Sequence, residues 1–287
     1  MTLHPLRIDA HQHFWRYDAA EYGWIDNAMT GLKRDFLPAD LRREMDAAGF
    51  DASVAVQARQ TPEETQWLLA LADAHPFVAG VVGWIDLRAS DVEAELERVR
   101  AHPRLVGLRH IVQAEADDFL ARPDVRRGVA ALQRADVPYD LLVYARQLRA
   151  VVEFVDGFPR QRFVLDHLGK PDIRANGFES WKQNFAALAR FPNVCCKLSG
   201  LVTEAHWDSW TPSQLRPYID VALEAFGPER LMIGSDWPVC TLAGSYQRTM
   251  EVVVDAIGPL SPDERAEILG GTAQRFWNLS VPARAGR

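Results

Sequence analysis

Short apolar runs alternate with longer amphipathic stretches along most of the chain. The runs are rich in β-branched residues and apolar at successive positions, which is typical of parallel strands buried on both faces. They lie at 6–10, 52–57, 78–85, 105–111, 138–143, 162–166, 194–198 and 230–233. The intervening stretches repeat apolar residues at helical spacing. The predicted helices cover 62–74, 91–101, 125–135, 145–155, 181–189, 212–225 and 246–257.

Two segments carry a clear signal for a helix N-terminus. Thr61 and Ser261 are each followed by a proline and then by two acidic residues. A capping hydroxyl, a proline in the first turn and early acidic side chains all favour the start of a helix. We therefore expect helices to begin directly after Thr61 and after Ser261.

Eight strands alternating with helices predict an α/β fold, a single-domain (β/α)8 TIM barrel over residues 1–287. A doubly wound open sheet is the alternative, and it would normally have fewer strands or a glycine-rich nucleotide loop. The sequence contains neither GxGxxG nor GxxxxGK[ST], and the absence of these motifs argues against an open sheet that binds a nucleotide. No linker rich in serine, glycine or proline divides the pattern into two domains.

Composition narrows the class of protein. Among 287 residues, 32 are Lys or Arg and 39 are Asp or Glu, which gives a net charge of −7. An acidic chain without a basic tract argues against nucleic acid or an anionic membrane as partner. No apolar run approaches the ~18 residues of a transmembrane helix, and the N-terminus lacks the apolar stretch of a signal peptide. Three cysteines without a CxxC motif exclude a disulfide framework. We expect a cytoplasmic protein, and whether it is a homo-oligomer stays open.

Polar residues gather where the predicted strands end. His11 and His13 follow strand one, His110 ends strand four, His167 follows strand six and Asp236 follows strand eight. The carboxyl ends of barrel strands meet at one mouth, so these side chains can converge there. Histidines at i and i+2 of a strand share a face, so both imidazoles can reach one ion or one substrate oxygen.

This arrangement resembles the amidohydrolase superfamily of (β/α)8 hydrolases over nearly the full length of the chain. The residues that match its pattern are His11, His13, His167 and Asp236. Four segments are similar to the sugar-lactonase branch, with its L-fuconolactonase-like and L-rhamnonolactonase-like enzymes: DAHQHFW, LDHLGKP, KLSGL and GSDWP. The resemblance implies a hydrolase of carbohydrate metabolism that opens a small-molecule sugar lactone to the sugar acid.

The resemblance also implies a metal site, with one departure. Metal-rich members carry a further histidine on strand five, which here reads PYDLLVY. A two-metal centre is therefore not expected. His11, His13, His167 and Asp236 supply enough nitrogen and oxygen for one divalent ion, for which zinc is the first choice. Some relatives resemble metal-independent lactonases, so the ion can be bound without being required.

Lactone hydrolysis needs an activated water, a polarised carbonyl and a proton for the leaving alkoxide. Asp236 is the candidate base, and the imidazoles or a metal would stabilise the oxyanion. His110 or Arg109 would hold the carbonyl or ring oxygens, and Lys197 is either solvated or ion-paired. The predicted catalytic residues are Asp236, His110 and His167. The predicted substrate contacts are Arg34, Arg109, Trp24, Gln57 and Trp84.

Other functions stay open beside the lactonase. A related decarboxylase or hydratase, or a pyrone-type lactonase, would act on a carboxylated substrate and would need arginines to clamp it. An amidase or deaminase is disfavoured by the missing histidine on strand five, and a serine hydrolase because Ser235 lacks the GxSxG context. A non-catalytic sugar-acid binder is disfavoured because binding alone does not need a base.

Overall fold

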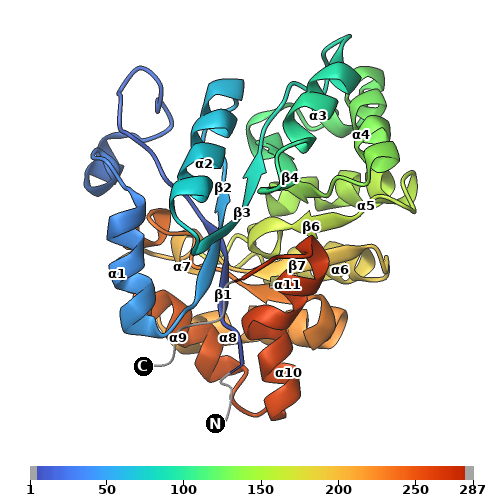
Figure 1. The fold of residues 1–287 in the computed structure, drawn as a ribbon. Helices are drawn as coiled ribbons and strands as arrows, with labels where there is room; N and C mark the ends of the chain where they lie inside the picture. The colour runs from blue at the N-terminus through green and yellow to red at the C-terminus, as the bar shows by residue number, and fades with distance from the viewer. Residues whose placement is uncertain (1–4, 282–287) are drawn as a thin grey trace.

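The computed structural model describes residues 5–281, and these form one barrel of eight parallel strands (Figure 1). Each strand pairs with the next one along the chain. The ring closes where the His13 amide donates to the Trp237 carbonyl at 2.7 Å and the Asp236 amide donates to the His11 carbonyl at 2.8 Å. The strands are β1 (Ile8–Gln12), β2 (Ala52–Val56), β3 (Val78–Gly83), β4 (Leu105–His110), β5 (Tyr139–Leu141), β6 (Phe163–Leu165), β7 (Val194–Leu198) and β8 (Leu231–Ile233). The predicted fold class is confirmed.

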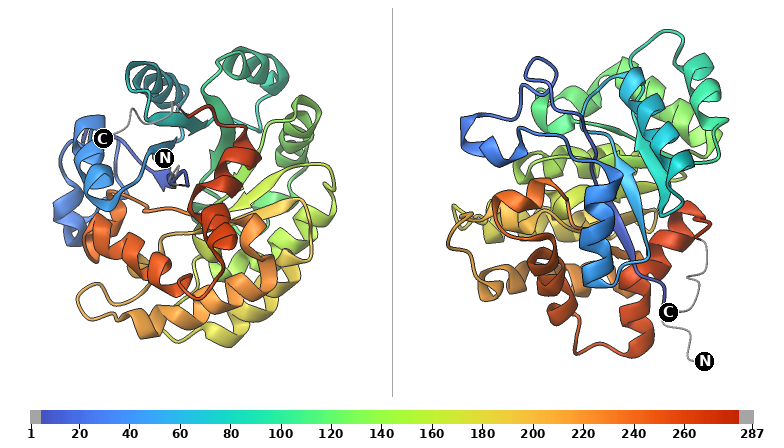
Figure 2. Two further views of the ribbon diagram at one scale, coloured as in Figure 1. Left: turned by 60° about the horizontal axis from the view of Figure 1, so that its bottom comes forward. Right: turned by 60° about the vertical axis from the view of Figure 1, so that its left-hand side comes forward.

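Helices surround the strands as an outer ring, which Figure 2 (left) shows from one end of the barrel. They are α1 (Pro38–Ala48), α2 (Pro62–Ala74), α3 (Val92–Arg100), α4 (Pro123–Ala135), α5 (Leu148–Asp156), α6 (Phe178–Ala189), α7 (Leu201–Glu204), α8 (Pro212–Phe226), α9 (Tyr246–Ala256), α10 (Pro262–Ala266) and α11 (Thr272–Trp277). None of the helices in the described part of the chain is both long and apolar enough to cross a membrane.

The two predicted helix starts are confirmed. The Thr61 hydroxyl accepts from the Glu64 amide at 3.2 Å, and the Ser261 hydroxyl accepts from the Glu264 amide at 3.3 Å. The Glu264 carboxylate in turn accepts from the Ser261 amide at 2.9 Å, which completes a capping box. Local sequence is therefore enough to set the beginning of α2 and α10.

The apolar core lies in two layers. The larger one packs the outer faces of the strands against the helices. The smaller one fills the barrel around side chains such as Ile8, Ala52 and Met232, and it includes Trp277 of α11. Because α11 contacts β1 and β8 and packs on residues that begin the strands, it covers the end of the barrel opposite the mouth.

The first strand differs from its prediction. The apolar run ends at residue 10, but β1 continues to Gln12 and its register against β2 shifts between Asp9 and Gln12. Polarity does not end the strand here, because His11 and Gln12 are buried among other polar groups at the mouth and their backbone still pairs within the barrel. His11 therefore belongs to the strand itself.

Candidate active site and metal site

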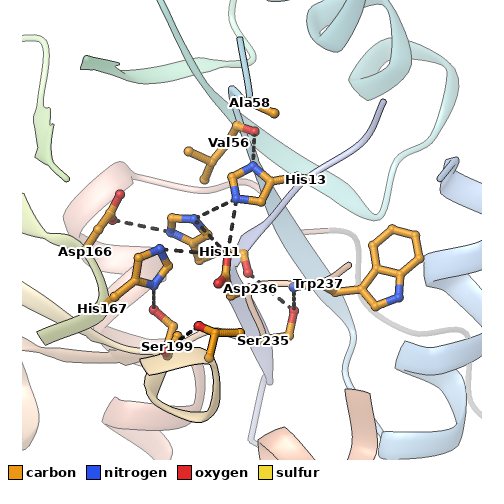
Figure 3. Close-up of polar contacts among 12 residues, drawn as sticks. His11, His13, Val56, Ala58, Asp166, His167, Ser199, Ser235, Asp236 and Trp237 are labelled. Atoms are coloured by element: carbon orange, nitrogen blue, oxygen red, sulfur yellow. Dashed lines mark hydrogen bonds and ion pairs between the residues drawn. The ribbon is translucent and has the colours of Figure 1, made fainter. Parts of the chain in front are cut away.

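Three imidazoles and one carboxylate point toward one another at the mouth of the barrel (Figure 3). The nearest oxygen of Asp236, Oδ1, lies 3.3 Å from Nε2 of His13 and 3.8 Å from Nε2 of both His11 and His167. The Nε2 atoms of His11 and His13 are 3.2 Å apart, so the two rings do share a side of the chain. Candidate ligand atoms of His11, His167 and Asp236 all lie within 4.8 Å of one another. The structure thus brings together the four residues predicted as metal ligands.

His167 is placed by an unusual turn directly after β6. His167, Leu168, Gly169 and Lys170 all have positive φ, between 48° and 67°. Consecutive residues in the left-handed region are costly for side chains other than glycine, so surrounding contacts must hold them. One such contact is the Trp181 indole N–H, which donates to the Leu168 carbonyl at 2.7 Å. The turn presents the His167 ring to the barrel mouth.

Asp236 is placed by the first strand. The Asp9 carboxylate accepts from the Ser235 amide at 2.9 Å and from the Ser235 hydroxyl at 2.6 Å. A Cβ on Gly234 would lie 2.8 Å from Cβ of His11, so only glycine allows the two segments to approach this closely. β1 and the segment after β8 are therefore locked together where they carry His11 and Asp236.

The rings of His13 and His167 are each oriented by a hydrogen bond at Nδ1, the ring nitrogen that faces away from Asp236. Nδ1 of His13 lies 2.7 Å from the Val56 carbonyl oxygen. Because a carbonyl can only accept, Nδ1 carries the proton and Nε2 presents a lone pair to Asp236. Nδ1 of His167 lies 2.8 Å from the Ser199 hydroxyl, and its Nε2 likewise faces Asp236. A polar partner behind each imidazole is the arrangement that metal-ligating histidines usually have.

The electrostatics of the cluster give the protonation states that a metal site needs. Burial, and then the Lys197 ammonium, hold the pKa of His11 well below its usual range. Burial also lowers the pKa of His167 to about 4. Burial alone would raise the pKa of Asp236, but the surrounding imidazoles, His167 foremost, favour its carboxylate form and lower that pKa. Neutral imidazoles and a carboxylate are the ligand forms that bind zinc-like ions.

The donor set therefore fits one divalent ion. Nε2 lone pairs of His11 and His13 that face each other at 3.2 Å repel unless a cation lies between them or one of them carries a proton. Such an ion would be held by His11, His13, His167 and Asp236. The Nδ1 atoms of His13 and His167 already have partners, the Val56 carbonyl and the Ser199 hydroxyl, so the Nε2 atoms of these two rings are directed towards the ion.

Below the mouth, four ionised side chains form a network that we call the buried charged network: Arg109, Asp140, Asp166 and Lys197. Nζ of Lys197 lies 2.6 Å from Oδ2 of Asp140 and 2.9 Å from Oδ1 of Asp166. Nη1 of Arg109 lies 2.9 Å from Oδ2 of Asp166. The side chains of Lys197 and both aspartates are 0% exposed and that of Arg109 is 3% exposed.

Sequence reasoning left Lys197 undecided and missed Asp140 and Asp166 as site residues. The structure shows that Lys197 is ion-paired and not solvated. A signal was present, because Asp140 and Lys197 are charged residues inside short strands whose other positions are almost all apolar. Charged side chains are rarely buried unless they are paired, so each one predicts a partner.

Arg109 and His110 are successive residues of β4, and their side chains take different partners. Arg109 donates to the main-chain and side-chain oxygens of Gln57 as well as to Asp166. Nδ1 of His110 accepts from the Trp84 indole at 3.2 Å, and its Nε2 lies 2.8 Å from Oε1 of Glu115. Both ring nitrogens of His110 are therefore engaged away from Asp236, and the structure does not bring His110 into the cluster.

The predicted substrate contacts divide into two groups. Arg109, Gln57 and Trp84 are buried and bonded as described above. Trp24 is 40% exposed, and Arg34 is exposed with its guanidinium 3.8 Å from the centre of the Phe36 ring. The group with exposed side chains lies in the long segment between β1 and α1.

Edge-to-face aromatic contacts connect this segment to the cluster. They run from Trp237, next to Asp236, through Phe36 and Trp15 to Trp24, with ring centres 5.3 to 5.8 Å apart. We call these four rings the aromatic wall. The exposed Trp24 is thus part of a packed surface that begins beside the candidate base.

Comparisons with known proteins agree with this site. Residues 8–279 match the sequence model of the amidohydrolase family described as Amidohydrolase. The chain is 47% identical to an L-fucono-1,5-lactonase of Burkholderia multivorans, with 98% of each chain covered. It is 38% identical to an L-fucono-1,5-lactonase of Burkholderia ambifaria, with 97% of each covered. The crystal structure of an amidohydrolase from Burkholderia multivorans with bound zinc has a TM-score of 0.93 and 45% identity, over 96% of this chain and 100% of that one.

Proposed function

The chain belongs to the amidohydrolase family, and on that premise we propose that it hydrolyses a sugar lactone, with L-fucono-1,5-lactone as the first candidate. The observation that carries this proposal is the convergence of His11, His13 and His167 on the Asp236 carboxylate at the barrel mouth. A sugar-acid binder would not need a carboxylate aimed into such a cluster. The 47% identity over nearly the whole of an L-fucono-1,5-lactonase supports the substrate class.

Asp236 is the proposed general base. Its side chain is 7% exposed and lies at the mouth, so a water beside it can donate a hydrogen bond to the carboxylate. As Asp236 takes the proton, the water oxygen bonds to the lactone carbonyl carbon. The ester C–O bond then breaks, and Asp236 returns the proton to the leaving ring oxygen, which becomes the free hydroxyl of the sugar acid.

His167, with His11 and His13, faces the region where charge develops on the carbonyl oxygen. We propose that these residues, with Asp236, hold one zinc ion, which when bound supplies Lewis-acid stabilisation of that charge. The donor set supports a single ion, and bound zinc in the structural relative supports its identity. The Nδ1 partners of the rings keep the Nε2 atoms directed at the reacting group.

The aromatic wall and Arg34 are the proposed contacts for the sugar. Trp24 offers an exposed ring face against which the C–H groups of a sugar can pack, and Arg34 can donate to hydroxyls. We assign Gln57, Trp84 and Arg109 to the support of the pocket, because their polar groups already bond to protein partners. We assign His110 to the same supporting role for the same reason.

A panel of lactones tests the proposal. Purified protein is mixed with L-fucono-, L-rhamnono-, L-galactono- and D-arabinono-lactones in weak buffer, and acid release is followed with a pH indicator. We expect the highest kcat/KM with L-fucono-1,5-lactone. Failure to release acid from any sugar lactone would refute the proposal. Release of carbon dioxide from an aromatic carboxylic acid would instead favour the decarboxylase alternative.

A further inference from the structure

The buried charged network lies against His11. Nδ1 of this ring faces two groups at once, Oδ1 of Asp166 at 3.3 Å and Nζ of Lys197 at 3.1 Å. A carboxylate can only accept and an ammonium can only donate. The two neighbours therefore favour opposite tautomers of His11, and only one of these tautomers can bind an ion through Nε2.

The tautomer with a proton on Nδ1 fits more of the surroundings. In that form the Nδ1 proton faces the Asp166 carboxylate, whose Oδ1 lies 3.3 Å away, and Nε2 keeps its lone pair, to which Arg109 can donate from Nη1 at 3.3 Å. In the opposite form, Nη1 of Arg109 would face the proton on Nε2. Lys197 does not depend on His11 as an acceptor, because its Nζ donates to Oδ2 of Asp140 at 2.6 Å and forms an ion pair with Oδ1 of Asp166 at 2.9 Å.

Both carboxylate oxygens of Asp166 are held by ion pairs. Lys197 binds Oδ1 at 2.9 Å and Arg109 binds Oδ2 at 2.9 Å. Lys197 is fixed in turn by Asp140 at 2.6 Å. Removal of Lys197 would leave Asp166 held by Arg109 alone and free to rotate away from His11.

We propose that Lys197 is a positioning residue, which holds Asp166 against Nδ1 of His11 and thereby presents Nε2 of His11 to the metal ion. Asp140 contributes to the same positioning role, because its carboxylate holds the Lys197 ammonium in place. This inference rests on the proposed metal site. It goes beyond that site by assigning a role to a residue that is fully buried and does not face the substrate.

Two effects of Lys197 on zinc binding have opposite signs, and this makes the proposal testable. Lys197 carries a positive charge close to the ligands, so as a charge alone it weakens the binding of a cation. As a positioning residue it strengthens binding. A variant that removes the charge but keeps similar bulk, Lys197→Met, therefore binds zinc more tightly if only charge matters and more weakly if positioning dominates.

The experiment measures zinc affinity of the full-length metal-free protein by competition with chelators of graded strength. We expect Lys197→Met to bind zinc about 10–100-fold more weakly than wild type, the usual cost of losing a partner behind a ligand. The matched control is Lys182→Met, because Lys182 is an exposed lysine of α6 whose ammonium lies 5.8 Å from the centre of the Phe178 ring. We expect this control to bind zinc as tightly as wild type or more tightly.

A second readout needs no zinc. Long-range ¹H–¹⁵N correlation on histidine-labelled, metal-free protein reports which nitrogen of His11 is protonated. We expect a proton on Nδ1 in wild type and in Lys182→Met, and a mixture or the reverse in Lys197→Met. If wild type binds no zinc, the proposed metal site is wrong, and this spectrum alone decides the positioning role.

If Lys197→Met does not fold, the double variant Asp140→Asn with Lys197→Met replaces it, because it removes one charge of each sign and leaves the net charge of the network unchanged. It should show the same weakening and the same change in His11. Zinc affinity equal to or higher than that of wild type, together with an unchanged His11 spectrum, would overturn the proposal.

Discussion

Replacing Asp236 with asparagine tests the mechanism most directly. Asparagine keeps the shape of the side chain and one acceptor oxygen, but it removes the negative charge on which three Nε2 atoms converge at 3.3 to 3.8 Å. Loss of a general base lowers rates by about 10²–10⁴-fold. Since each tenfold change corresponds to about 1.4 kcal/mol, the barrier should rise by about 2.7–5.4 kcal/mol. We expect kcat on the best lactone to fall by that factor.

The assay must separate the base from the metal and from folding. Acid release is measured at saturating lactone and at saturating zinc, with bound zinc quantified in each sample. Affinity for the sugar-acid product, measured by calorimetry, should change by less than about threefold, because Trp24 and Arg34 lie away from the substituted carboxylate. The control is His206→Ala, since His206 is exposed and its backbone carbonyl, which the substitution keeps, accepts from the Ser209 and Trp210 amides.

A kcat for Asp236→Asn within about threefold of wild type at full zinc occupancy would refute the reasoning, because general-base loss is far larger than that. Water would then be activated by another group. His110 would be the next residue to test, although its ring would first have to release Trp84 or Glu115.

Three further predictions concern the ion, the pH dependence of folding and the packing. Elemental analysis of zinc-loaded protein should find one ion per chain, with part of the activity surviving chelation; two ions at full activity would contradict a mononuclear site. Burial raises the pKa of Glu64 from its usual value of 4.5 to about 7, so the folded protein keeps a proton that the unfolded chain loses, and stability falls as pH rises between these values. In wild type, the unfolding free energy measured by urea titration should therefore be lower at about pH 8 than at about pH 5. Glu64→Gln cannot titrate and should reduce this difference by up to about 3 kcal/mol, and a variant that keeps the wild-type difference would contradict the reasoning. Gly128→Ala would place a Cβ 2.2 Å from the Leu87 carbonyl oxygen, so we expect it to lower the free energy of unfolding by about 1–3 kcal/mol, measured by thermal melting. The control is Gly31→Ala, whose Cβ would meet nothing within 4 Å and which should leave the melting temperature nearly unchanged.

The repeating elements of this fold could be predicted from the sequence. All eight strands lie within or overlap the apolar runs, and α2 has the bounds that its cap and periodicity indicate. The cluster of His11, His13, His167 and Asp236 was also predictable. The barrel topology carries the ends of separate strands to one mouth, so position along each strand is enough to collect these residues.

Contacts across the barrel could not be predicted in the same way. Lys197 on β7 pairs with Asp140 on β5, a strand that is not its neighbour in the sheet. Strand periodicity gives the alternation of side chains but not which set faces inward, and that choice separates Arg109 from His110. The inward set is fixed by how all eight strands close, which no single segment specifies.

The end of the barrel opposite the mouth has a consequence for how the protein is made. The ring of Trp277, in the last helix described, lies 5.2 Å from Nζ of Lys197 and packs with the side chains that fill the barrel. A ribosome adds about 5–20 residues per second from the N-terminus, so Trp277 emerges after His11 and after all four residues of the buried charged network. A nascent chain without α11 exposes the network beneath His11 to water. Burial of this network beneath the candidate ligands therefore waits for α11, a helix that carries none of those four ligands.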